Sequence, residues 1–224
     1  QDPVIILANG NYPSHPIPLQ KIMDAGSIIC CDGSMNNLAK HGLEPIAIIG
    51  DLDSLDEKHK IKHQKKLFHT PDQNQNDLRK AMQWIEKQNI NHVTILGATG
   101  KREDHSLGNI FSLIEFKTKT KFSMITDHGI FTTIENEKKF KSFKGEQVSI
   151  FSTNSKIKIT STGLKYNLNN YMVNNLYSCA LNESNNGTFN INYYDGDDRN
   201  QVLIASGSKI FKSEIPVGWT QPDI

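Results

Sequence analysis

Residues 46–55 read IAIIGDLDSL, and this stretch decides how the first half of the chain folds. Its four leading apolar residues, rich in isoleucine, predict a short strand that is buried on both faces. Gly50 ends that strand, and Asp51 and Asp53 follow at alternate positions. Ligands of open α/β sheets collect beyond the carboxyl ends of the strands, and two carboxylates there suit a hard cation such as Mg²⁺. Taken alone, the motif is explained equally well by a surface turn whose aspartates cap the next helix.

Two earlier segments repeat the pattern of an apolar run followed by a polar side chain. VIILA at residues 4–8 predicts a buried strand that leads to Asn9, and SIICC at residues 27–31 predicts another that leads to Asp32. Turns and short helices are expected between the strands. Because each of these strands delivers Asn or Asp at its carboxyl end, the sequence favours an α/β domain with a polar site at one edge of a parallel sheet.

Two further segments carry candidate site residues. TPDQNQND at residues 70–77 precedes a helix with one apolar face, and Asp77 at its start either stabilises the helix dipole or serves a site. GATGKREDH at residues 97–105 follows another apolar strand. Its glycines, Arg102 and the helix behind it favour a phosphate, although the P-loop spacing is absent. Helix capping by Asp104 and His105 is the competing interpretation.

Two other segments are interpreted as having no role in a site. Pro13, Pro16 and Pro18 are expected to keep their segment out of helix, so that the first helix runs from Leu19 to Ala25. The Lys- and His-rich run at residues 58–66 is expected to form a solvated helix face.

From about residue 131 the chain changes to short alternating segments separated by turn signals. The segments at 147–151, 156–160, 189–194 and 202–205 predict strands of an all-β sandwich or barrel. The expected organisation is therefore an α/β domain over residues 1–130 and an all-β domain over residues 131–224.

Composition excludes some classes of function. With 25 Lys and Arg against 24 Asp and Glu, the chain gives no argument for a nucleic-acid partner. No apolar run approaches the length of a membrane span and no signal peptide is visible. Cys30, Cys31 and Cys179 lack metal-ligand spacing and are expected to be buried thiols, which favours a reducing, cytoplasmic location.

In order along the chain, these motifs resemble those of the thiamin pyrophosphokinase family. The motifs are DGS at 32–34, GDLDS at 50–54, TPDQ at 70–73 with Asn76-Asp77, and Arg102 with Asp104-His105; TSTGLKYNL at 160–168 resembles that family's thiamin-domain segment. The resemblance implies a Rossmann-like parallel α/β nucleotide-binding domain followed by a β-sandwich. It further implies a homodimer with thiamin bound between subunits, and a Mg²⁺-dependent transfer of pyrophosphate from ATP to thiamin that releases AMP.

The resemblance also implies roles for individual residues. Asp51, Asp53 and Asp77 match the acidic metal positions, with Asp32 beside the nucleotide or metal, and either Asp53 or Asp77 takes the proton of the attacking hydroxyl. Arg102 holds the ATP phosphates and Asp104 orients it. The remaining expected positions are Asn9 and His105 in the nucleotide site, and Gln73, Tyr166 and Asn182 in the thiamin site.

Three positions depart from the family pattern. Asn76 replaces the usual Thr before the metal-site Asp, Tyr166 stands where many members carry Trp, and Leu181 stands where Ser is common. Two alternatives to the pyrophosphokinase therefore stay open. One is a Mg²⁺-dependent hydrolase of nucleotides or diphosphate esters on the same scaffold, and the other is a nucleotide or vitamin sensor without turnover.

Overall fold

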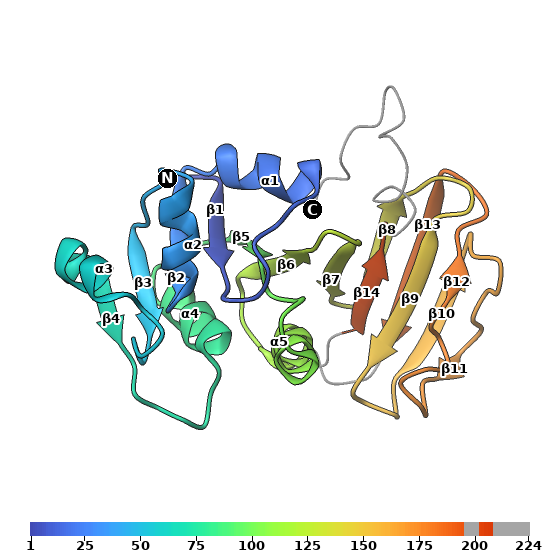
Figure 1. The fold of residues 1–224 in the computed structure, drawn as a ribbon. Helices are drawn as coiled ribbons and strands as arrows, with labels where there is room; N and C mark the ends of the chain where they lie inside the picture. Colours follow the sequence, from blue (N-terminus) through green and yellow to red (C-terminus); the bar gives the residue numbers. More distant parts are fainter. Residues whose placement is uncertain (195–201, 208–224) are drawn as a thin grey trace. The chain divides into compact units, whose positions relative to one another are not determined.

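The computed structural model describes residues 1–194 and 202–207. The chain forms two compact units, Gln1–Asp127 and His128–Ile224, which are coloured from blue to green and from green-yellow to red in Figure 1. Each unit is described by itself.

The first unit is built on six parallel strands. Their order across the sheet is β6-β5-β1-β2-β3-β4, and each neighbouring pair runs parallel. The strands are β1 (Val4–Leu7), β2 (Ser27–Cys31), β3 (Ala47–Gly50), β4 (Leu67–His69), β5 (His92–Leu96) and β6 (Lys121–Ile125). The chain starts in the middle, moves outward to β4 and then returns to the other side of β1. This reversal places a topological switch point between β1 and β5, where open α/β sheets bind ligands.

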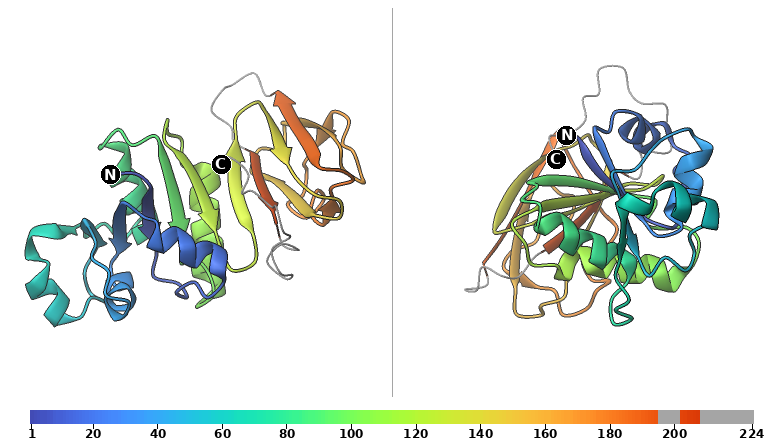
Figure 2. Two further views of the ribbon diagram at one scale, coloured as in Figure 1. Left: turned by 90° about the horizontal axis from the view of Figure 1, so that it is seen from above. Right: turned by 90° about the vertical axis from the view of Figure 1, so that its left-hand side faces the viewer.

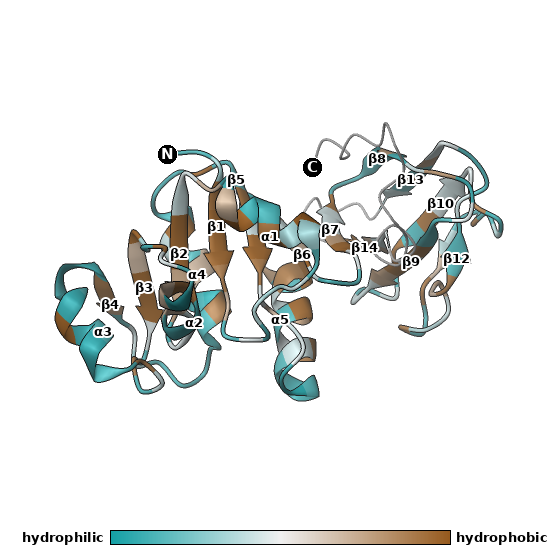
Figure 3. Ribbon diagram, turned by 45° about the horizontal axis from the view of Figure 1, so that its top comes forward, coloured by the Kyte–Doolittle hydropathy of each residue, from teal (hydrophilic) through white to brown (hydrophobic). Residues whose placement is uncertain are grey.

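Helices cover both faces of this sheet, as a doubly wound fold requires. They are α1 (Pro16–Met23), α2 (Ser34–Lys40), α3 (Glu57–Lys62), α4 (Asp77–Glu86) and α5 (Glu103–Glu115), with a short 3₁₀ turn at Gln64–Lys66. In Figure 2, α1 and α2 lie on one side of the strands and α5 lies on the other, where α4 and α5 contact each other. The strands between them are hydrophobic along their length (Figure 3), and β1, β2 and β3 are buried throughout.

Two expectations for this unit were wrong in detail. The first helix begins at Pro16 rather than Leu19, because the first turn of a helix leaves its N–H groups unpaired and tolerates proline. The run at residues 58–66 is not wholly solvated. His59 and His63 are 7% and 3% exposed, since their spacing of four residues puts both rings on the inward face while Ile61 points outward.

The second unit is a β-sandwich, as expected. One layer of the sandwich has the strand order β12-β9-β14-β7 and the other has the order β11-β10-β13-β8. Ile150 and Ile204 from the first layer share one hydrophobic core with Ile159 and Ile191 from the second. The strands are β7 (Ile130–Ile134), β8 (Glu137–Lys141), β9 (Gln147–Ser152), β10 (Lys158–Thr162), β11 (Tyr171–Met172), β12 (Asn182–Glu183), β13 (Thr188–Tyr194) and β14 (Val202–Ser206).

Alternation of buried and exposed residues explains why these segments form a sandwich. Along β13 every second side chain is buried, which is the period of a strand with one face on the core. Among the described residues, none of the helices is long and apolar enough to cross a membrane.

Candidate functional site

The carboxyl ends of the parallel strands of the first unit surround one cleft of about 570 Å³. Parallel register brings the residues after β1, β2, β3 and β5 to the same edge of the sheet. The cleft walls include almost all of the site residues predicted for this unit: Asn9, Asp32, Asp51, Asp53, Gln73, Asp77, Arg102 and His105.

Three carboxylates meet in this cleft. Asp32, Asp51 and Asp53 each offer an oxygen, and these oxygens lie within 4.8 Å of one another. Leu52, between the last two, has a φ of +65°, a left-handed conformation that is uncommon for a branched residue and clusters at functional sites. The helix-capping alternative for Asp51 and Asp53 does not hold, because the N-cap residue of α3 is Asp56.

Asp32 is the most buried member of this acidic group, at 2% exposure. Its Oδ2 accepts a hydrogen bond from the Ser54 amide at 3.1 Å, whereas its buried Oδ1 has no partner within the structure. Burial raises the pKa of Asp32 to about 6, and the neighbouring Asp77 and Asp53 charges add to that rise against the hydrogen bonds from Ser54. A cation bound among these oxygens would satisfy the unpartnered atom, and an all-oxygen donor set suits Mg²⁺.

Gly50 allows the carboxylates to approach one another. A Cβ at this position would lie 2.9 Å from the Cβ of Asp32 and 3.2 Å from Oδ1 of Asp77. Any side chain there would therefore push these two acids away from the strand end. The Gly in IIGD is thus explained by the site as well as by the end of β3.

Asp77 opens α4, and its capping role is taken by another residue. The side chain of Asn76 accepts the capping hydrogen bond from the Arg79 amide at 2.8 Å. Asp77 instead accepts a hydrogen bond on Oδ1 from the Lys80 ammonium at 3.0 Å. Burial raises the pKa of Asp77, while Lys80 opposes that rise. The functional interpretation of Asp77 is therefore favoured over simple capping.

Asp51 is held on both of its oxygens. Oδ2 accepts from the Gln73 side chain at 3.2 Å and Oδ1 accepts from the Asp53 amide at 3.3 Å. Its partial burial acts to raise the pKa of Asp51, but these hydrogen bonds and the nearby Lys80 charge hold it below its ordinary value. Asp51 thus carries a full negative charge at neutral pH, which favours cation binding.

The loop after β5 supplies cations to the same cleft. Arg102 makes a two-point pair with Asp104, through Nε to Oδ1 at 3.1 Å and through a second nitrogen to Oδ2 at 2.5 Å. Lys101 donates to Oδ1 of Asn9 at 3.1 Å. The guanidinium is 67% exposed, so it is free to approach a phosphate while Asp104 restrains it.

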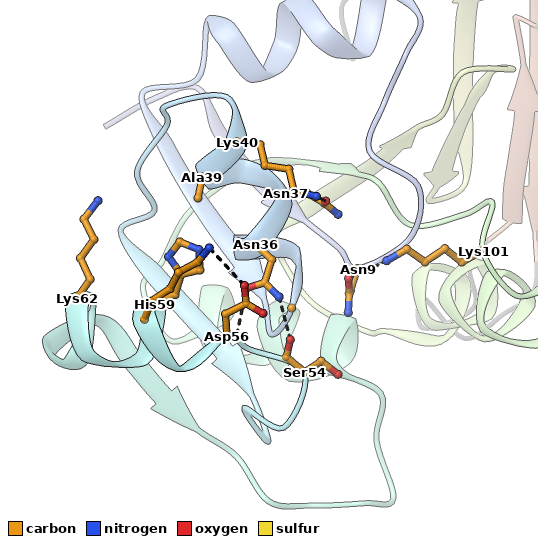
Figure 4. A pocket seen from close by; sticks show the side chains of 12 residues that line it. Asn9, Asn36, Asn37, Ala39, Lys40, Ser54, Asp56, His59, Lys62 and Lys101 are labelled. Atoms are coloured by element: carbon orange, nitrogen blue, oxygen red, sulfur yellow. Dashed lines mark hydrogen bonds and ion pairs between the residues drawn. The ribbon is translucent and has the colours of Figure 1, made fainter.

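A second cavity of about 800 Å³ adjoins this cleft and shares Asn9, Ser54 and Lys101 with it. Figure 4 shows side chains from its walls: Asn36, Asn37 and Lys40 come from α2, and His59 and Lys62 come from α3. Asn36 joins the two sides, because it donates to the Ser54 carbonyl at 3.0 Å and accepts from the Asp56 amide at 3.2 Å. Ammonium and amide groups dominate this lining, which suits a polar or anionic group.

The remaining predicted residues, Tyr166 and Asn182, come together in the second unit. The Asn182 side chain accepts from the Tyr166 amide at 3.1 Å and donates to the Tyr166 carbonyl at 2.7 Å. Asn182 is buried, whereas the Tyr166 side chain is 65% exposed. Asn182 therefore fixes the backbone of Tyr166 and leaves the ring open to solvent.

Sequence reasoning missed several polar residues of the cleft, among them Ser54, Lys80 and Lys101. A signal existed for Lys80, which follows Asp77 by three residues on a helix, the spacing of an ion pair. The sequence does not indicate that Lys80 is buried, since lysine is normally exposed.

Known proteins resemble this chain in both units. A sequence model of the thiamin pyrophosphokinase catalytic domain matches residues 19–126, and a model of the thiamin pyrophosphokinase substrate-binding domain matches residues 129–196. The thiamine pyrophosphokinase of Bacillus subtilis (strain 168) is 30% identical over 138 residues, which are 58% of this chain and 64% of that protein. Thiamin pyrophosphokinase 1 of Caenorhabditis elegans is 33% identical over 97 residues, which are 39% of this chain and 40% of that protein.

Solved structures share the fold. The crystal structure of thiamine pyrophosphokinase from Bacillus subtilis has a TM-score of 0.73 at 22% identity and covers 92% of this chain and 99% of that one. Thiamin pyrophosphokinase from Candida albicans has a TM-score of 0.71 at 17% identity, with 90% and 88% of the two chains covered. The matches to curated sequences span less than two thirds of those relatives, but the two domain models together cover most of this chain. The chain therefore belongs to the thiamin pyrophosphokinase family.

Proposed function

We propose that this protein transfers a pyrophosphoryl group from ATP to the hydroxyl of thiamin, forming thiamin diphosphate and AMP. The observation that carries the proposal is the cleft at the strand ends, where Asp32, Asp51 and Asp53 converge beside the cationic Arg102 loop. A polyphosphate with a bound divalent cation needs this combination, because phosphoryl transfer depends mainly on positioning and charge neutralisation. Family membership makes thiamin the expected acceptor.

The metal set of this proposal is Asp51, Asp53 and Asp77, with Asp32 as an additional ligand through its unpartnered Oδ1. A Mg²⁺ held by these carboxylates would neutralise the negative charge of the phosphates. Asp51 is already held in place by Gln73. The pair between Asp77 Oδ1 and Lys80 leaves the second oxygen of Asp77 available to the cleft.

In the reaction, the thiamin hydroxyl oxygen bonds to the β-phosphorus of ATP, and the bond from that phosphorus to the oxygen bridging to the α-phosphate breaks. AMP leaves with that oxygen. The hydroxyl proton passes to one of the two candidate bases, Asp53 or Asp77, both of which line the cleft.

The cations and amides of the cleft position the nucleotide. Arg102, restrained by Asp104, is assigned to the phosphates, and Asn9 and His105 are assigned to the nucleotide because they line the same cleft. Lys101 joins them as a second cation beside Asn9.

Gln73, Tyr166 and Asn182 form the acceptor side of the proposal. The exposed Tyr166 ring would stack on thiamin, and Asn182 would hold the Tyr166 backbone for that contact. We further propose a homodimer with thiamin bound between subunits, and a cytoplasmic enzyme, which the three free buried cysteines support.

Replacing Asp51 and Asp53 together with Asn tests the proposal. We expect thiamin-dependent consumption of ATP to fall below detection while thermal unfolding stays cooperative, because the variant loses two charges but no packing. The matched control is Asp24→Asn with Glu57→Gln, which removes two exposed carboxylates outside the cleft. Full activity in the Asp51/Asp53 variant would overturn the assignment of the site.

A further inference from the structure

Lys80 is buried beside the acidic cleft. Its side chain is 4% exposed, and it is the one lysine that is buried in the part of the chain the structure describes. Its ammonium lies 3.0 Å from Oδ1 of Asp77, and the side chain also lines the cleft. Asp51 and Asp53 line the same cleft. Lys80 therefore stands next to the carboxylates assigned to the metal.

Stability alone does not account for a lysine at this position. The other buried residues of α4 include Leu78, Ala81 and Met82, and the helix packs on β2 and β3. Taking an ammonium out of water is costly, and an apolar side chain of similar size often serves stability equally well. Burial of Lys80 is compensated by the carboxylates that it faces, so its place in the fold depends on the acidic cleft.

We propose that Lys80 is a positioning residue that acts as the built-in counter-charge of the cleft. It fixes Asp77 through Oδ1, and its positive charge weakens the binding of a bare divalent cation among the carboxylates. The cation then binds in the cleft together with nucleotide phosphates, because their negative charge compensates the positive charge of Lys80. This inference rests on the proposed function, because it takes the metal and the nucleotide phosphate from it.

The charge and the hydrogen bond of Lys80 are separable by substitution. Lys80→Met removes both, Lys80→Gln removes the charge and keeps a donor for Asp77, and Lys80→Arg keeps the charge. Lys60→Met is the matched control, because Lys60 forms an ion pair with Glu57 at the same three-residue spacing, at 3.3 Å on α3.

The test is titration of each full-length variant with Mn²⁺ alone, in which the free ion is followed by electron paramagnetic resonance. We expect Lys80→Met and Lys80→Gln to bind Mn²⁺ about tenfold more tightly or better, since a like charge close to the ion has been removed. Lys80→Arg and Lys60→Met are expected to stay within about twofold of the wild type, a change that corresponds to less than half of a kcal/mol.

Tighter binding distinguishes this role from a structural one, because a variant that merely disturbs the cleft loses affinity. Thermal unfolding shows whether each variant is folded. If Lys80→Met does not fold, the Mn²⁺ affinities of Lys80→Gln and Lys80→Arg are compared instead. Unchanged or weaker Mn²⁺ binding in the neutral variants, or no binding in any variant, overturns the proposal.

The same variants also report on catalysis. With Mg²⁺ and ATP present, Lys80→Gln is expected to lower kcat and raise the KM for ATP, and Lys80→Arg is expected to restore part of both. Mn²⁺ titration needs neither thiamin nor turnover. If the neutral variants bind Mn²⁺ more tightly but the wild type forms no thiamin-dependent AMP, the proposed function is wrong and the role of Lys80 stands. If the wild type turns over normally but the neutral variants bind Mn²⁺ with unchanged affinity, the role of Lys80 is wrong and the proposed function stands.

Discussion

At the scale of single residues, the buried carboxylate of Asp32 lowers the stability of the free protein and favours cation binding. Its carboxylate is almost fully buried, and one of its oxygens has no partner. Without a cation, ionisation of Asp32 opposes folding, because the charged form is better solvated in the unfolded chain. Burial of the ionised carboxylate therefore destabilises the folded protein when no cation is bound, and a bound cation would relieve that destabilisation.

The pKa of Asp32 predicts a pH dependence. A carboxyl group whose pKa rises from 3.8 to about 6 on folding binds its proton more tightly in the native state, so stability falls as the pH rises through that window. Two pKa units correspond to at most about 3 kcal/mol. We expect Asp32→Asn to be more stable than the wild type above pH 6 and to lose this advantage near pH 4. Urea unfolding in EDTA at several pH values measures the difference in free energy of unfolding between the variant and the wild type. A difference that does not vary with pH would contradict the prediction.

Gly50 gives a second prediction at this scale. Gly50→Ala places a methyl group 2.9 Å from the Asp32 Cβ, which we expect to cost roughly 1–3 kcal/mol of stability and to lower turnover about a hundredfold. The control is Gly42→Ala, which has a φ of +70° but no atom within 4 Å of the added Cβ. It is expected to lose about 1 kcal/mol and to retain full activity. Equal activity losses in the two variants would remove Gly50 from the site.

At the scale of elements, α4 is positioned by the residue that caps it. Asn76 caps the helix through the Arg79 amide, and its amide nitrogen reaches Asn109 and Ser112 on α5 at 3.1 and 3.3 Å. The departure from the usual Thr therefore adds a link between two helices on the same face of the sheet. Asp77 and Lys80 lie in the turn that this cap fixes.

Removing the cap has a predicted cost. We expect Asn76→Ala to destabilise the protein by about 1–2 kcal/mol and to lower activity through displacement of Asp77. Asn76→Thr retains a capping oxygen and is expected to keep most of the stability and most of the activity. Thermal unfolding and turnover measured in parallel test this, and a fully active Asn76→Ala would show that the cap does not position Asp77.

The elements that were predictable are those that local patterns specify. An apolar run followed by Gly and Asp marks the end of a buried strand, so the edge that carries Asp32 and Asp51 follows from the sequence together with the rule for parallel sheets. Alternation likewise predicted β9 and β13. The burial of Lys80 and His59 was not predictable, because it depends on the segments that surround α4 and α3 in the folded protein. The Tyr166–Asn182 hydrogen bonds join residues that are 16 positions apart.

At the scale of the whole molecule, the second unit exposes apolar side chains. Leu181 and Tyr177 are 82% and 78% exposed, and Leu181 has a φ of +60°. Contiguous exposed apolar patches mark interaction surfaces, and we propose that Leu181 lies in the contact between the two copies.

The proposed homodimer predicts a mass of twice the 25.2 kDa of the chain in light scattering after size exclusion. We expect Leu181→Glu to shift the population toward the monomer, since a carboxylate is poorly tolerated in a closed apolar interface. Met23→Glu, at an exposed apolar position on α1, is the control for the added charge. A monomeric wild-type protein would contradict the proposed dimer.

The central claim is that a pyrophosphoryl group passes intact from ATP to thiamin. The direct measurement is a quenched reaction with thiamin, ATP and Mg²⁺ in which AMP, ADP, thiamin monophosphate and thiamin diphosphate are resolved. We predict AMP and thiamin diphosphate in a one-to-one ratio, with formation of both dependent on thiamin. Formation of ADP with thiamin monophosphate, or consumption of nucleotide at the same rate without thiamin, would contradict the claim.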